Sequence, residues 1–207
     1  MNKARILKSL GILCLILCLL AWFYAATFPR VNPLHTCNDP TALQKLAQYD
    51  RDYIKQHPYS TNQKPCPRWE YLTRTASVFY SPRLPSILLG SGHVVWGTVT
   101  QIADDGCITV KIKRNVIGHF GLNNTVEVND VTPTLEVGKE YILFLNFDSF
   151  KKAYMTTCIE HGIFAVTPEG LYAYSNSTDL SAYDGQSPRA LIDQLRRTYS
   201  EMMDLIK

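Results

Sequence analysis

The chain has 207 residues, of which 46% are hydrophobic and 19% are charged, and its net charge is +3. This composition excludes a disordered chain and a protein with many membrane spans. The small positive charge gives no reason to expect a nucleic acid as partner. A chain of this length has room for about one domain of ordinary size.

The N-terminal segment predicts membrane attachment. Residues 1–8 carry Lys3, Arg5 and Lys8, whereas residues 9–29 contain no charged side chain. About 20 apolar residues cross a bilayer as a helix, and positive charges in front of such a run keep that end in the cytoplasm. We therefore expect a cytoplasmic basic end over residues 1–8 and one transmembrane helix over residues 9–29, in contact with the lipid bilayer. The rest of the chain would lie outside the cell membrane, in a periplasmic or extracellular space.

A cleaved signal peptide is the alternative for this segment. Its apolar region is usually shorter, roughly 7 to 15 residues, and it ends at a site that prefers small residues. Cleavage after Ala26 would place Tyr24 where a small residue is preferred, which favours an uncleaved anchor. Both outcomes export the same domain, which would be secreted if cleavage occurred.

Four cysteines follow the apolar segment, namely Cys37, Cys66, Cys107 and Cys158. An even number of cysteines in an exported domain predicts disulfide bonds, and four cysteines allow three connectivities. A disulfide between Cys37 and Cys66 would link the two ends of the segment that contains a helix predicted to end at about Gln56. Cys107 with Cys158 would then close the strand region, and the rival pairing joins Cys37 to Cys158 and Cys66 to Cys107. The chain has no Cys-x-x-Cys pair, and we expect neither a metal site nor a cofactor.

Residues 31–92 are predicted to form a helix and loop extension. Asp39 followed by Pro40 is typical of a helix start, and apolar residues recur at helical spacing to about Gln56. Asp50 interrupts this apolar face. The residues after this helix are rich in proline and polar side chains, which predicts a loop.

Residues 93–175 have the pattern of short strands separated by turn residues. The stretch HVVWGTVTQIADDGCITVKIKR predicts two strands joined at Asp104-Asp105-Gly106, and Gly97 inside the first strand predicts a bulge or bend. Further strands at similar spacing predict a small barrel or sandwich. Residues 184–207 predict an amphipathic helix that begins at Ser187-Pro188, with a face expected to pack on the barrel.

Five segments carry a family resemblance: PSILLGSGHVVWGTVTQI, ITVKIKRNVIG, TVEVN, LEVGKEYILFL and GIFAVTPEGLYAYS. Their order resembles the TIMP-like, or netrin-module, OB-fold domain of exported bacterial proteins. The residues that match its first and fourth strand motifs are Val94, Val95, Gly97, Val99, Gly138, Tyr141, Leu143, Phe144 and Leu145. The resemblance implies a mainly β, OB-like barrel with flanking N- and C-terminal helices.

The resemblance does not extend to the inhibitory mechanism. Tissue inhibitors of metalloproteinases bind the protease zinc through a free N-terminal Cys-x-Cys. Here Cys37 follows the apolar segment, and residue 39 is Asp39. Inhibition by that mechanism is therefore not expected.

Motifs of known enzymes are absent from the sequence, and we predict no catalytic residues. Ser91 and His93 are neighbours in an extended stretch, where close neighbours point apart. We therefore expect a non-catalytic binding or scaffolding module of the cell envelope, with a protein partner there. The alternatives are an inhibitor or regulator of an extracytoplasmic protease, and an enzyme with an unrecognised site, which would gather His93, His119 or His161 beside carboxylates.

Two further patterns concern the surface. Lys111, Lys113 and Arg114 would line one strand, where a solvated face explains them better than nucleic acid does. Asn123 and Asn176 each begin an Asn-x-Ser/Thr sequence, which predicts N-glycosylation if the host is a eukaryote.

Overall fold

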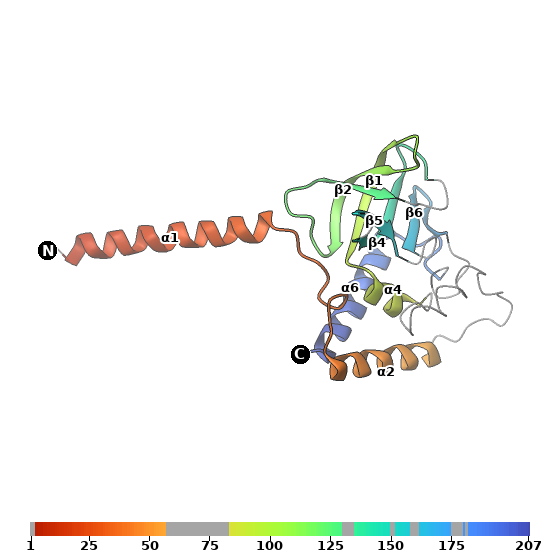
Figure 1. Ribbon diagram of the computed structural model, residues 1–207, viewed down its shortest axis with the longest axis horizontal. Helices are drawn as coiled ribbons and strands as arrows, with labels where there is room; N and C mark the ends of the chain where they lie inside the picture. The colour runs from red at the N-terminus through yellow and green to blue at the C-terminus, as the bar shows by residue number, and fades with distance from the viewer. Residues whose placement is uncertain are drawn as a thin grey trace.

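The computed structural model describes residues 3–56, 83–129, 135–149, 152–157, 162–174, 180 and 182–207, although the side chains of residues 3–10, 25, 26 and 54 are not described. Its helices are α1 (Lys3–Thr27), α2 (Pro40–Gln56), α4 (Leu84–Gly90) and α6 (Pro188–Leu205). Its strands are β1 (His93–Ile102), β2 (Ile108–Ile117), β3 (Thr125–Asn129), β4 (Glu140–Asp148), β5 (Ala153–Thr156), β6 (Ile163–Thr167) and β7 (Gly170–Ala173). Figure 1 shows the barrel with α4 and α6 against it, and α1 extending away from the domain.

Five strands close into a barrel in the order β1-β2-β3-β5-β4-β1. The neighbours are antiparallel except β3 and β5, which are parallel. Residues 145–148 of β4 pair with β5, and residues 140–143 of the same edge pair with β6, which leads into the hairpin with β7. The predicted mainly β barrel with flanking helices is confirmed, and this topology is consistent with an OB fold.

Both faces of β4 are buried from residue 141 to residue 145, because this part of the strand separates two cores. Tyr141, Leu143 and Leu145 belong to the core that includes Val95, Val110 and Val126 of β1, β2 and β3, and therefore point into the barrel. Ile142 and Phe144 point outward, where they join the side chains of α2, α4 and α6. The continuous apolar run of β4 follows from this two-sided burial.

Gly97 bends β1 as the sequence predicts. The register between β1 and β2 shifts between Trp96 and Gly97. A Cβ atom on Gly97 would lie 2.6 Å from Cγ1 of Val110 and 2.7 Å from the carbonyl oxygen of Lys111. Only glycine therefore allows the two strands to approach this closely.

Helices α4 and α6 pack on the outer face of the sheet, and α2 packs on these two helices. Asp39 caps α2 by accepting hydrogen bonds from the backbone N–H groups of Thr41 and Ala42, each at 3.2 Å. Ser187 accepts one from the N–H of Ala190 and caps α6, as predicted. The buried face of α6 consists of Leu191, Ile192, Leu195, Thr198 and Met202. This burial confirms that the helix packs on the domain.

The sequence did not predict α4, and it left Asp50 unexplained. All seven residues of α4 are buried, so the segment shows no polar face from which a helix could be inferred. Ser86 on α4 donates a hydrogen bond of 2.8 Å to Oδ1 of Asp50 on α2. The carboxylate that interrupts the apolar face of α2 thus accepts a hydrogen bond from the neighbouring helix.

The side chains of α1 from residue 12 to residue 24 are all exposed. Taken over the residues that the structure describes, no helix is both long enough and apolar enough to cross a membrane. The transmembrane helix predicted over residues 9–29 is therefore not supported by this structure.

Candidate functional site

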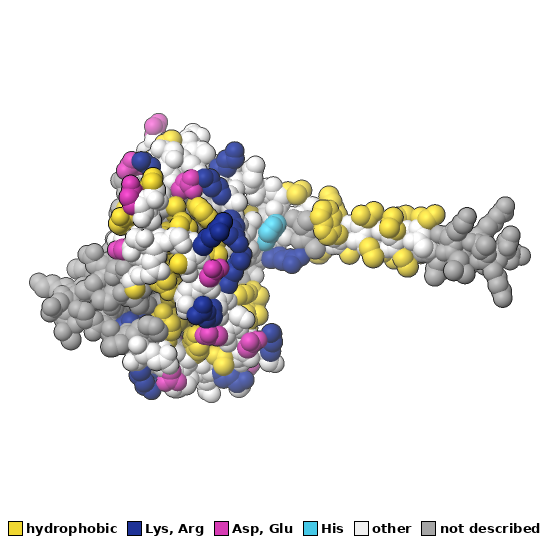
Figure 2. All heavy atoms as spheres, turned by 180° about the vertical axis from the view of Figure 1, so that it is seen from behind, with side chains coloured by type: hydrophobic (Ala, Val, Ile, Leu, Met, Phe, Trp, Pro, Cys, Tyr) yellow, Lys and Arg dark blue, Asp and Glu magenta, His cyan; other side chains and the backbone are white. Residues whose placement is uncertain are grey.

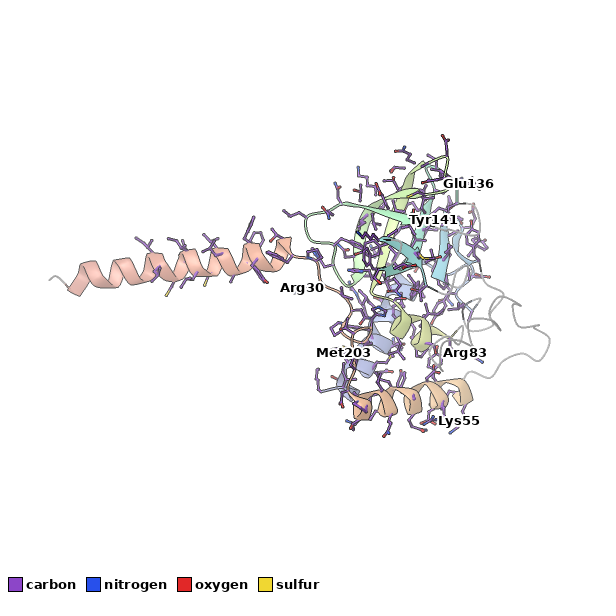
Figure 3. The ribbon with its side chains drawn as sticks, viewed as in Figure 1. Arg30, Lys55, Arg83, Glu136, Tyr141 and Met203 are labelled. Carbon is purple, nitrogen blue, oxygen red and sulfur yellow. The ribbon has the colours of Figure 1, made fainter. Side chains whose placement is uncertain are left out.

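The segment that follows α1 is bonded to the barrel through its backbone. The N–H of Arg30 donates to the carbonyl of His119 at 2.7 Å, and the N–H of His119 donates to the carbonyl of Arg30 at the same distance. The N–H of Asn32 donates to the carbonyl of Gly92 at 2.8 Å. We refer to residues 27–35 together with residues 118–124 as the junction, and Figure 3 places Arg30 in it, between α1 and the barrel.

The side chain of Asn32 is the buried centre of the junction. Its Nδ2 group donates to the carbonyls of Leu88 and Ser91, each at 2.9 Å, and its Oδ1 accepts from the N–H of Leu34 at 3.0 Å. Asn32 is fully buried, so these bonds replace hydration that the amide loses on folding. The amide therefore ties the chain leaving α1 to the segment that connects α4 with β1.

Two glycines on the β2–β3 loop allow the junction to close. Gly118 and Gly121 have φ values of +70° and +67°, in the left-handed region that favours glycine. A Cβ atom on Gly121 would lie 2.2 Å from the carbonyl oxygen of Thr27, and one on Gly118 would lie 2.9 Å from that of Arg30. Both positions therefore require glycine for two reasons, backbone conformation and close approach.

His93, the first residue of β1, lies beneath this junction. It is 2% exposed, and neither ring nitrogen has a hydrogen-bond partner among the residues that the structure describes. Its ring stacks on Phe120 with centroids 4.2 Å apart and meets Tyr154 edge-on at 5.5 Å. Burial lowers the pKa of His93 from its usual 6.5 to about 4, with smaller contributions from His35 and His119. The imidazole is therefore neutral near pH 7.

The predicted histidine candidates are only partly brought together. His119 lies near His93, and its Nδ1 accepts a hydrogen bond of 2.8 Å from the N–H of Gly121. Nδ1 of His35, which sequence reasoning did not single out, lies 3.2 Å from the carbonyl of Leu89. His161 lies outside the described residues. Among the residues that are described, no group of three or more His, Cys, Asp or Glu side chains could hold a metal ion.

Ser91 and His93 do not form a nucleophile and base pair. The hydroxyl of Ser91 lies 2.5 Å from the carbonyl oxygen of Ile87 and 3.0 Å from Oγ1 of Thr157. Ser91 is fully buried, and its hydrogen-bonding capacity is used within the fold. This geometry suits a structural role rather than attack on a substrate.

The outer face of β2 carries the predicted basic residues. Lys111, Lys113 and Arg114 are exposed. Lys113 forms an ion pair with Glu140 on β4, whose other carboxylate oxygen accepts a hydrogen bond of 2.9 Å from the indole of Trp96. Figure 2 shows Lys and Arg side chains gathered on the half of the domain nearer α1.

The acidic turn between β1 and β2 is explained by local structure. Oδ1 of Asp105 accepts a hydrogen bond of 2.9 Å from the N–H of Cys107. Gly106 has a φ of +83°, and its N–H donates to the carbonyl of Ala103 at 2.9 Å. The predicted turn is therefore confirmed.

The disulfide predictions fall partly outside the described residues. Cys37 and Cys107 are half-buried and have free thiols, whereas Cys66 and Cys158 are not described. Burial raises the pKa of the Cys107 thiol, and nearby Glu127 and Asp105 raise it further. This is the opposite of what an activated cysteine nucleophile needs. No disulfide is seen within the described part of the chain, so the pairing stays a prediction.

Of the two predicted glycosylation positions, Asn123 is exposed on the β2–β3 loop, and Asn176 lies outside the described residues. The chain matches no protein-family model, no curated protein and no solved structure.

Sequence reasoning missed the junction. Its residues belong to two segments that are nearly 90 positions apart, roughly the length of a small domain. The available signal was GHFGLNN at residues 118–124, where two glycines within four positions suggest unusual backbone geometry. Nothing in the sequence indicates that Asn32 would be buried.

Proposed function

We propose that this protein is a membrane-anchored, exported, OB-like barrel that acts as a non-catalytic binding or scaffolding module of the cell envelope. The observation that carries the proposal is the contrast between the two parts of the chain. The barrel and its helices bury their apolar side chains in two cores, whereas α1 exposes its own.

Helix α1 exposes more apolar surface than is favourable in water. Its exposed large apolar side chains are Ile12, Leu13, Leu15, Ile16, Leu17, Leu19, Leu20, Trp22, Phe23 and Tyr24, each between 46% and 71% exposed. Contiguous apolar surface of this kind indicates a membrane or protein partner. Lys3, Arg5 and Lys8 precede it, which favours a cytoplasmic N-terminus and an exported barrel.

The junction supports a scaffolding role. Backbone bonds at Arg30 and Asn32 leave little freedom between α1 and the barrel. An anchor joined in this way would present the barrel at a set distance and orientation from the membrane, which a flexible linker would not do.

Membrane fractionation tests the anchor. The full chain, expressed in cells, should stay with the membranes after alkaline carbonate washing, and protease added outside the membrane should digest its barrel. Ile16→Arg with Leu20→Arg places two charges in α1, which should cost roughly 6 kcal/mol of insertion free energy and release the protein.

The matched control is Gln44→Arg with Gln48→Arg, which adds the same charges at the same spacing to exposed positions of α2. This variant should stay with the membranes. Complete release of the unsubstituted chain by carbonate would contradict the anchor. A mature chain that begins after Ala26 would show that the segment is a signal peptide and that the protein is secreted.

The binding role is tested by cross-linking in intact cells. A photoreactive residue at Tyr172, which is 44% exposed on β7, should give a defined product with an envelope protein. The same probe should be placed in turn at the exposed positions of the other strands. If none of them gave a product, the barrel would have no stable partner and the proposal would be wrong.

A further inference from the structure

The β2–β3 loop displays an apolar side chain beside α1. Leu122 is 72% exposed, more than any other large apolar side chain in the described part of the chain. A single exposed leucine needs no explanation by itself. Its location does, because Figure 1 shows this loop reaching out from the barrel toward the C-terminal end of α1.

The residues before Leu122 hold it in this exposed position. Phe120 is 4% exposed and belongs to the barrel core, so it fixes the loop from the inside. Gly121 abuts the carbonyl of Thr27, the last residue of α1, and His119 is hydrogen-bonded to Arg30. Leu122 is therefore directed away from the core and held next to the end of the helix.

We propose that this loop is a second membrane contact, in which Leu122 enters the boundary between headgroups and acyl chains beside α1. The inference rests on the proposed function, because it requires α1 to be in the bilayer. The occupant of this surface is then the lipid itself. With two contacts in place of one, the barrel rests on the membrane in one orientation.

The surrounding side chains have the chemistry of a membrane interface. Tyr24 and Phe28 are 63% and 52% exposed, and their ring centroids lie 4.2 Å apart. The amphipathic ring of a tyrosine prefers the headgroup level. Arg30 is exposed in the junction, where an arginine suits lipid phosphates. Exposed amides follow Leu122 in the loop, which limits the insertion to one apolar side chain.

The charge of the neighbouring strand favours anionic lipids. β2 leads into this loop and exposes Lys111 and Arg114. The basic side chains in Figure 2 gather on the same half of the domain. A basic residue near an anionic membrane increases binding about fivefold.

Lipid-quenching fluorescence of the full chain in vesicles tests the proposal. A fluorescent noncanonical residue is placed at Leu122 or, as the matched control, at Val137, which is 57% exposed on the turn before β4. Figure 3 places the neighbouring Glu136 on the side of the barrel away from α1. Phosphatidylcholine vesicles carrying nitroxide-labelled lipids, with or without phosphatidylglycerol, should quench the probe at position 122 and leave the probe at 137 unquenched.

The outcomes separate this inference from the proposed function. Loss of the chain from carbonate-washed vesicles would overturn the anchor and the loop contact together. Retention of the chain with equal quenching at 122 and 137, or with none at either position, would overturn the loop contact alone.

A charge comparison tests the preference for anionic lipids. Quenching at position 122 gives the ratio of chains whose β2–β3 loop contacts the bilayer to chains whose loop does not. Arg114→Gln should lower this ratio about fivefold, and only on vesicles that contain phosphatidylglycerol. Lys139→Gln, at an exposed residue on the same turn as Val137, should not change the ratio. Equal effects of the two substitutions would show that the basic side chains of β2 do not face the membrane.

Discussion

Replacing His93 with leucine should remove a pH dependence of stability. The pKa of His93 is about 4 in the folded protein, against 6.5 for a solvated histidine. Between these values the unfolded chain binds a proton that the folded chain does not, so the free energy of unfolding falls as the pH falls from 6.5 to 4. The difference of about 2.5 pH units corresponds to roughly 3 kcal/mol, which is lost at acid pH and fully present above pH 6.5.

Urea denaturation of the full chain in mild detergent, followed by circular dichroism, measures this effect. The unsubstituted chain should lose stability across that range, whereas His93→Leu should have a much flatter profile. Near neutral pH the variant should be about as stable as the parent, because no described residue is a hydrogen-bond partner of either ring nitrogen of His93 and leucine adds no buried polar group. His119→Asn keeps a side-chain acceptor for the N–H of Gly121 and is the control that should retain most of the pH dependence, because His119 makes only a smaller contribution to the lowered pKa of His93.

The reasoning would be refuted by parallel profiles for His93→Leu and the parent. That result would mean that His93 is solvated or has a partner, so that its burial does not exclude the charged form. A flat profile for His119→Asn would show that His119, rather than His93, causes the pH dependence.

Three further predictions concern the junction and the cysteines. In thermal unfolding, Gly121→Ala should lower the free energy of unfolding by roughly 1 kcal/mol more than Gly106→Ala does, or by a larger difference. Both glycines have positive φ, but of the two only Gly121 faces a carbonyl oxygen. Equal losses of stability would contradict the close contact. Asn32→Ala should lower the free energy of unfolding by roughly 2 to 4 kcal/mol, since it removes three buried hydrogen bonds, and an unchanged denaturation midpoint would show that water replaces them. Cys107 has a free thiol in the structure. In the exported domain that we propose, peptide mapping without reduction should join Cys107 to Cys158, a closure of about 50 residues that contributes roughly 4 kcal/mol; free thiols at both would exclude this staple.

Local patterns were sufficient for most individual elements. The start of α2 at Pro40, the cap at Ser187 and the bulge at Gly97 depend on residues whose backbone preferences act within a few positions. The strands were predictable because alternating burial appears directly in the order of apolar and polar side chains. The acidic turn at Asp105 belongs to the same class.

The candidate site depended on contacts that no local pattern reports. His93 begins a stretch predicted to be a strand, and it is the first residue of β1, but its burial by Phe120 and the junction depends on residues far from it in the chain. Asn32 looks like an ordinary polar residue after an apolar segment until the carbonyls of Leu88 and Ser91 are brought to it. Helix α4 was missed because it is buried all round and has no polar face.

The sequence by itself determined an apolar N-terminal helix, a strand-rich region and two amphipathic helices, since each follows from short-range periodicity. Only the tertiary structure decided that five strands close through the β1–β4 pairing, and that the segment after α1 is bonded to the β2–β3 loop. Both are contacts between residues far apart in the chain. Their free energy depends on complementary surfaces that exist only after the elements have packed, so no window of sequence contains it.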